Sequence, residues 1–154
     1  MEYLAVKWVH ILSSTVLFGT GLGSAFYMLF ASRTRDPRAV AVVVRHVVVA
    51  DWLFTAPTLV LQPSSGLYLV HLAGMDLHSK WLVWSIGLYL LAGACWLPVV
   101  WLQIRMRDIA ADAAKRDVEL PPVYWSYLKS WVALGVVAFF SLVAVFFLMV
   151  VKPA

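Results

Sequence analysis

Four long apolar stretches are the feature that most restricts how this chain can fold. Three of them cover residues 3–30, 81–104 and 127–151, and each exceeds the roughly 20 residues that a helix needs to cross the hydrocarbon core of a bilayer. The fourth covers residues 40–72 and is interrupted by polar residues and prolines. The sequence is 63% hydrophobic and 13% charged over 154 residues, far from the composition of a soluble domain. We therefore predict a single all-α domain, an integral membrane four-helix bundle.

The apolar run at residues 40–72 is longer than one crossing requires. We predict a helix over residues 37–51 on the cytoplasmic side, followed by the crossing itself at residues 52–72. Pro37 suits the first turn of such a helix, because a proline there gives up no hydrogen bond. The alternative places the crossing at residues 40–61 and leaves the rest of the run outside the membrane.

The positive charges indicate the orientation of the bundle. Residues 31–38 and 105–122, which follow the first and third apolar stretches, hold seven of the 12 lysines and arginines. These seven are Arg33, Arg35, Arg38, Arg105, Arg107, Lys115 and Arg116. Loops rich in lysine and arginine stay on the cytoplasmic side, so both termini are expected on the outer, periplasmic side. This distribution of the net charge of +4 argues against a nucleic-acid partner.

The first apolar stretch carries a histidine and a lysine on one helical face. His10 lies three residues after Lys7, so the two side chains point the same way. A neutral imidazole at His10 could ligate haem iron, with Lys7 near a propionate. The alternative is a buried histidine that hydrogen-bonds a neighbouring helix. The opposite face carries Gly19 and Gly23, a spacing that lets membrane helices approach closely.

A polar stripe follows one face of the second apolar run. Asp51, Thr55, Thr58, Gln62 and Ser65 repeat at spacings of four and three residues, which is the period of one helical face. Such a stripe could line a cofactor cleft or a path for protons or small solutes. It could also serve only to hydrogen-bond neighbouring helices, as hydroxyl and amide side chains often do in membranes.

Within this stripe we expect Asp51 to have a cationic partner, because an unpaired carboxylate inside a membrane raises the free energy of the folded protein. Arg45 and Arg105 are the candidates from the cytoplasmic side. Pro57 and Pro63 each remove a backbone donor, so we expect the helix to kink.

The other histidines restrict where a haem could bind. His71 is expected near the outer surface, roughly level with His10, so these two could be the axial ligands of one haem. His46 and His71 are about 37 Å apart along a continuous helix and therefore cannot share one iron.

The rest of the sequence shows no complete catalytic set. There is no nucleophile with its base, no phosphate-binding loop and no pair of carboxylates, and the single cysteine, Cys95, lies within an apolar stretch. A soluble-type hydrolase or nucleotide enzyme is therefore excluded. Whether the chain is an enzyme of another kind stays open.

Three segments resemble a known bacterial family. They are KWVHILSSTVLFGTGLGSAFYM from Lys7, ADWLFTAPTLVLQPSSGLYLVHLAG from Ala50 and LAGACWLPVVWLQIRMRD from Leu91. The family consists of predicted four-span integral membrane proteins catalogued as a domain of unknown function, and the resemblance covers nearly the whole chain. It implies a multi-pass protein of the bacterial inner membrane but no established activity.

A more distant likeness suggests a chemistry. The Lys7-x-x-His10-Ile11 start is similar to that of HemJ-type protoporphyrinogen oxidases and CopD-like membrane proteins, and FTAPT from Phe54 resembles the TTPG element of the HemJ-type proteins. In those proteins the first-helix histidine is implicated in binding haem b, which implies this role for His10. Their WLHIK element is replaced here by WLVWS at residues 81–85. The missing histidine and lysine argue against porphyrinogen oxidation.

The leading hypothesis from the sequence is a haem b-binding redox protein, with His10 and His71 as axial ligands and a quinone or a membrane redox subunit as partner. The alternative is a cofactor-free membrane subunit that docks a partner protein. A third interpretation makes the stripe from Asp51 to Gln62 a proton or small-solute pathway. Four helices are few for a transporter, so this pathway would require a homo-oligomer.

Overall fold

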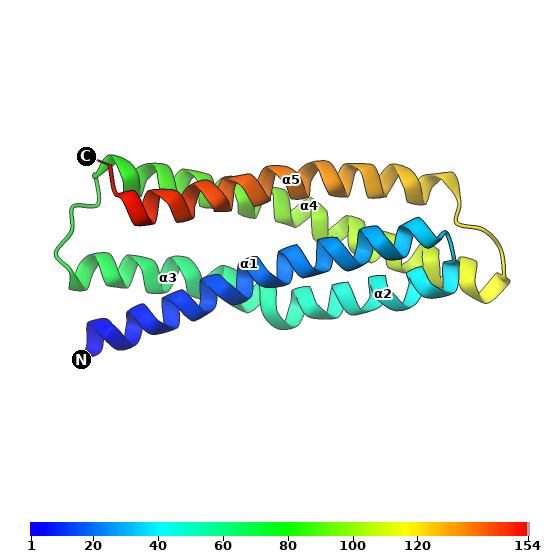
Figure 1. Ribbon diagram of the computed structural model, residues 1–154, viewed down its shortest axis with the longest axis horizontal. Coiled ribbons are helices and arrows are strands. Elements are labelled where there is room, and N and C mark those ends of the chain that lie inside the picture. Colours follow the sequence, from blue (N-terminus) through cyan, green and yellow to red (C-terminus); the bar gives the residue numbers. More distant parts are fainter. Residues whose placement is uncertain (154) are drawn as a thin grey trace.

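The computed structural model describes residues 1–153, and every regular element within them is a helix (Figure 1). The elements are α1 (Glu2–Thr34), α2 (Pro37–Ala50), the π-helical segment η1 (Asp51–Thr55), α3 (Ala56–Leu72), α4 (Lys80–Arg116) and α5 (Pro122–Val151). Four helical runs are long and apolar enough to cross a membrane, namely α1, the continuous run Pro37–Leu72, α4 and α5. The prediction of an all-α chain with four spans is thereby confirmed.

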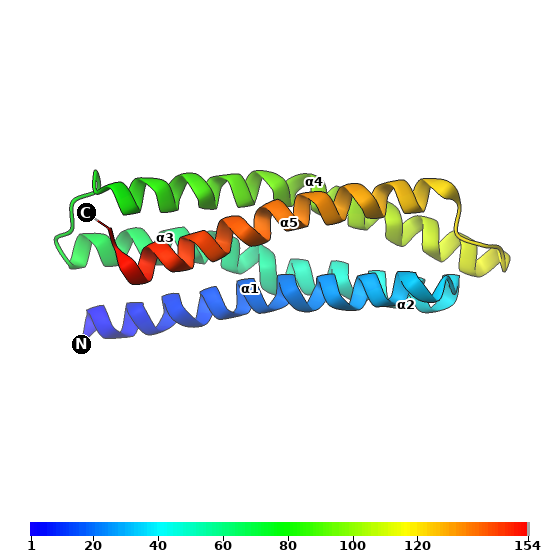
Figure 2. The ribbon, with the colours of Figure 1, turned by 45° about the horizontal axis from the view of Figure 1, so that its top comes forward.

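The four runs form an elongated bundle with the helices roughly aligned along its long axis (Figures 1 and 2). α1 lies beside α2 and α3, and α4 lies beside α5. Both ends of the described chain lie at the same end of the bundle, on the left in Figure 1. Which side of the membrane this end faces stays a prediction from the positive charges.

The outside of the bundle is strongly apolar. Large hydrophobic side chains stand exposed on every helix, and examples with exposed fractions between 53% and 68% are Phe26, Val42, Val60, Leu90 and Phe147. In α5, only 6% of the most apolar 18-residue window is buried inside the protein. Soluble proteins rarely leave such extensive apolar surface in water. These faces therefore contact the lipid of the bilayer.

The second span is one continuous helical run whose hydrogen-bonding pattern changes at η1. The N–H of Ala56 donates to the carbonyl oxygen of Asp51, five residues back, which is the pattern of a π-turn. Pro57 follows directly, and in a regular α-helix its ring would crowd the carbonyl of Leu53. The wider turn relieves this crowding, which accounts for a π-segment at this place.

α2 extends the bundle lengthwise. It packs against α1 and α4, and its Val40, Val44 and Val47 are buried in one cluster with Met28 and Met106. α2 therefore lies alongside α1 and does not lie flat across the end of the bundle. The second run has 36 residues and is about 54 Å long, well beyond the ~30 Å of the hydrocarbon core. How this run divides between bilayer and cytoplasm stays a prediction.

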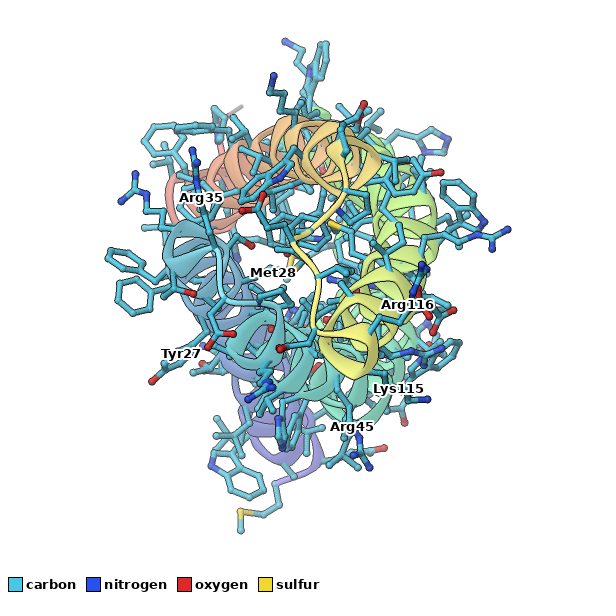
Figure 3. All side chains as sticks on the ribbon, turned by 90° about the vertical axis from the view of Figure 1, so that its right-hand side faces the viewer. Tyr27, Met28, Arg35, Arg45, Lys115 and Arg116 are labelled. Atoms are coloured by element: carbon cyan, nitrogen blue, oxygen red, sulfur yellow. The ribbon has the colours of Figure 1, made fainter. Side chains whose placement is uncertain are left out.

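The larger of the two buried apolar clusters in residues 1–153 lies toward the end of the bundle that holds the α1–α2 and α4–α5 loops. Tyr124 is fully buried there, and its hydroxyl hydrogen-bonds Ser32 Oγ at 2.7 Å, which joins α5 to α1. Figure 3 looks onto this end, where Met28 points into the bundle and the exposed Arg45 and Arg116 lie at its edge. The apolar core is thus concentrated at the end that we predict to be cytoplasmic.

Replacing Tyr124 by phenylalanine should destabilise this end of the bundle. The change keeps the ring but leaves the buried Ser32 hydroxyl without its partner, a loss of about 1–3 kcal/mol. Thermal unfolding in detergent measures it. Tyr27→Phe is the matched control, because Tyr27 is 64% exposed, and it should leave the unfolding temperature unchanged. Equal effects of the two substitutions would show that the Ser32–Tyr124 bond contributes nothing.

Candidate functional site

A cavity of about 290 Å³ lies between the helices next to η1. Residues of α1, η1, α3, α4 and α5 line it, and most of its wall is apolar. Five aromatic side chains contribute to the wall: Phe18, Tyr89, Trp96, Trp131 and Phe139. The cavity has about twice the ~150 Å³ of a protein cavity that holds benzene. A molecule with one ring and a short chain would therefore fit.

One corner of this cavity is polar. Asp51 is 5% exposed, and the hydroxyl of Thr55 donates to its Oδ1 at 2.9 Å, across the π-segment. Gln103 of α4 contributes a side-chain amide and is 2% exposed. All three residues line the cavity. π-Turns within helices occur frequently at functional sites, and this one begins at the residue that carries the carboxyl.

Three residues of the cavity wall hold a buried polar atom without a hydrogen-bond partner. The atoms are Gln103 Oε1, Trp96 Nε1 and Trp131 Nε1, out of five such atoms in residues 1–153. Each unpaired group costs about 1–3 kcal/mol, and protein interiors contain few of them. Each of the three atoms is itself fully buried, so a molecule in the cavity would reach it only after the side chain rotates.

Asp51 has no cationic partner within residues 1–153. The four ion pairs in this part of the chain involve other residues. The two arginines expected to pair with Asp51 do not: Arg45 is exposed, and the guanidinium of Arg105 lies 5.5 Å from the centroid of the Trp101 ring. An ionised carboxylate in this setting needs a cation, or a proton must neutralise it. The cavity therefore contains one unmatched acidic group.

The cavity opens sideways between α1 and α5. The lining residues that remain exposed lie on these two helices, with Gly21 and Leu22 on α1 and Gly135 and Val136 on α5. A Cβ at either glycine would have no atom within 4 Å, which leaves the opening clear. The lining residues of η1, α3 and α4 are buried or half-buried. Because the exposed faces of the bundle contact lipid, a molecule dissolved in the bilayer would reach the cavity here.

His10 lies outside this cavity, in the contact between α1 and α3. Its Nδ1 is 2.8 Å from Ser65 Oγ, and its Nε2 is 3.2 Å from the amide nitrogen of Gln62. Both ring nitrogens of His10 therefore have a partner on α3 within hydrogen-bonding distance. These bonds agree with the alternative interpretation of His10, a histidine that hydrogen-bonds a neighbouring helix.

Gly66 lets this imidazole lie directly against the backbone of α3. A Cβ at Gly66 would be 3.1 Å from Cε1 of His10, closer than ordinary van der Waals contact. The expected close approach at Gly19 and Gly23 is absent within the described chain, since a Cβ at either would have no atom within 4 Å. The glycine that allows close packing against α1 is therefore Gly66 of α3 and not a glycine of α1 itself.

Haem ligation by His10 and His71 stays a prediction, and the two histidines have different surroundings in this conformation. Both ring nitrogens of His10 are already hydrogen-bonded. His71 and Lys7 are exposed, and His71 stacks on Tyr68 with ring centroids 6.5 Å apart. Residues 1–153 contain no group of three or more His, Cys, Asp or Glu side chains that could hold a metal ion. Haem b binding stays a prediction that requires Gln62 to move away from His10 Nε2.

The predicted polar stripe faces the interior but divides into two parts. Asp51 and Thr55 line the cavity, whereas Gln62 and Ser65 contact the histidine of α1. Thr58 is buried between them and donates to carbonyls of its own helix. Across residues 1–153 no side-chain hydrogen bond joins the two parts, and a proton pathway along the stripe stays a prediction.

Sequence reasoning missed the residues that complete the polar corner. Gln103 is the single amide in the apolar stretch of residues 91–104, which is the same kind of signal that marked Asp51. Trp96 and Trp131 are two of eight tryptophans, most of which fall where interfacial tryptophans are common. Nothing in their spacing distinguishes these two as cavity residues.

The fold and the cavity define a polytopic α-helical membrane protein with an intramembrane pocket. Residues 4–153 match the family described as predicted integral membrane protein (DUF2269), and the chain belongs to this family of unknown function. Neither a curated protein nor a solved structure matches the chain. The likeness to HemJ-type and CopD-like proteins therefore stays an expectation from the sequence.

A leucine at Gly66 should disrupt the contact between α1 and α3. The larger side chain would meet the imidazole of His10 and destabilise the protein by about 1–3 kcal/mol. The same substitution should have a smaller effect in a His10→Ala background, which frees the space. Chemical unfolding of the four proteins of this double-mutant cycle measures the coupling.

Gly87→Leu is the control for this cycle. Gly87 is exposed on α4, and a Cβ there would have no atom within 4 Å. Leucine is also a better helix former than glycine, so this variant should be as stable as the wild type or more stable. Strictly additive effects of Gly66→Leu and His10→Ala would contradict the contact.

Proposed function

We propose that this chain binds a small, mainly apolar molecule that enters its cavity from the lipid phase. The observation that carries the proposal is the buried polar corner of Asp51 and Gln103 in an otherwise apolar cavity that opens between α1 and α5. Binding sites for small molecules are typically apolar, with a few placed polar groups that fix the orientation of the ligand. The corner and the aromatic walls meet this description.

Each part of the cavity has a distinct role in this proposal. Asp51 and Gln103 bind the polar end of the ligand, and the aromatic side chains of the cavity wall contact its apolar body. The glycines at the opening, Gly21 and Gly135, leave room for passage because they carry no side chain. We place the protein in the bacterial inner membrane with its arginine-rich loops toward the cytoplasm, in agreement with the positive-inside bias.

The neutral probe 2-phenylethanol tests this binding directly. Its ring and short chain suit a cavity of about 290 Å³. Isothermal titration with the protein in phosphatidylcholine nanodiscs should give saturable binding beyond the partitioning into empty nanodiscs. Gly135→Leu fills the opening and should weaken binding about tenfold or more, equivalent to at least ~1.4 kcal/mol.

Gly87→Leu is the matched control, because Gly87 is exposed on α4 and does not line the cavity. It should bind the probe as the wild type does. Binding that is absent in the wild type, or that is equal in the Gly135→Leu and Gly87→Leu variants, would overturn the proposal.

Haem-dependent redox chemistry is the second candidate function. It is favoured by the position of His10 inside the bundle, where a neutral imidazole would offer Nε2 to an iron once Gln62 moved aside. A cofactor-free subunit that docks a partner protein is the further alternative. The absorption spectrum of the purified protein, oxidised and then reduced with dithionite, separates them. Haem b gives a Soret band and sharp α and β bands on reduction, and His10→Ala should abolish them.

A further inference from the structure

We propose that the molecule bound in this cavity is a small organic cation, a protonated amine on a mainly apolar body. The inference rests on the proposed function and names the class of ligand. It follows from the hydrogen-bonding groups, the charge and the aromatic wall of the cavity, each of which favours a protonated amine over a neutral molecule of the same size.

The polar corner has spare hydrogen-bond acceptors. The carboxyl of Asp51 accepts one hydrogen bond, from the hydroxyl of Thr55. Gln103 Oε1 has no partner. An ammonium group has three N–H donors and no acceptor, so it can bind the carboxylate and, once the Gln103 amide rotates, Gln103 Oε1 as well. An alcohol has one such donor, and a ketone has none.

The charge of the corner favours a cation. Asp51 is 5% exposed, and no lysine, arginine or histidine of residues 1–153 forms an ion pair with it. A hydrogen bond from a charged amine to a carboxylate is roughly twice as strong as one between neutral groups. A protonated amine would therefore supply the counter-ion that the protein itself does not provide.

The aromatic wall suits the same ligand. Tyr89, Trp96 and Trp131 line the cavity together with Asp51. A cation within about 6 Å of the face of such a ring is attracted to it, most strongly by tryptophan. The apolar remainder of the wall accommodates a hydrocarbon body of about one ring.

Comparison of 2-phenylethylamine with 2-phenylethanol tests this inference. The two probes have the same ring and chain length, but the amine carries a proton at neutral pH. Zwitterionic phosphatidylcholine nanodiscs avoid the attraction of the amine to anionic lipid, and empty nanodiscs give the background. The wild type should bind the amine about tenfold more tightly than the alcohol or better.

Asp51→Asn is the discriminating variant, because it keeps the shape of the side chain and removes only the charge. It should lose the preference for the amine and still bind the alcohol. Asp112→Asn is the matched control, since Asp112 is an exposed carboxylate of α4 outside the cavity. It should keep the preference of the wild type. The comparison of the two probes on the wild type needs no variant and stands even if Asp51→Asn does not fold.

The outcomes separate the inference from the proposed function. If the wild type binds the alcohol as tightly as the amine, the amine proposal is overturned while the cavity remains a binding site. A preference for the amine that persists in Asp51→Asn also overturns it, because the charge of Asp51 then plays no part. Failure of both probes to bind overturns the amine proposal together with the proposed function.

Discussion

A buried carboxyl group without a cationic partner is the constraint on which the structure of this site depends. An ionised carboxylate inside a bilayer costs several kcal/mol, and the chain offsets part of this cost with a hydrogen bond from Thr55 of the same π-segment. The amide of Gln103 on the facing helix lines the same cavity. The Thr55 bond orients the carboxyl but leaves it without a cationic partner. We infer that the missing charge comes from outside the chain, and the cavity beside Asp51 is where it would be bound.

The same stretch of sequence produces both the π-helical segment of the second span and the polar corner of the cavity. Pro57 forces the helix to widen just before it, and the widened turn contains both Asp51 and Thr55. On one side of this turn, α2 packs tightly against α1 and α4. On the other side, α3 holds His10 of α1 against Gly66. The cavity thus lies between two packed regions, the contact of α2 with α1 and α4 on one side and the contact of α3 with α1 on the other.

The four-helix architecture could be predicted from the sequence because the local composition of a segment determines whether it forms a membrane-spanning helix. Length and apolar character alone predict the four spans, and the periodicity of polar residues correctly turns Asp51, Thr55, Thr58 and Ser65 inward. The sites depend on which helices become neighbours, which periodicity does not reveal. His10 was a candidate iron ligand because of its type, and only the register of α3 brings Gln62 and Ser65 onto its nitrogens. The same holds for Gln103, which the packing of α4 places in one cavity wall with Asp51, whereas no arginine forms an ion pair with that carboxyl.

The most direct test of this account is an experimental structure of the protein in lipid nanodiscs with 2-phenylethylamine present. The account predicts that the cavity between α1 and α5 contains density for the amine, with its nitrogen within hydrogen-bonding distance of Asp51 and Gln103. It also predicts that no arginine or lysine of the chain reaches the carboxyl. A structure in which side chains fill the cavity, or in which Arg45 or Arg105 forms an ion pair with Asp51, would contradict it.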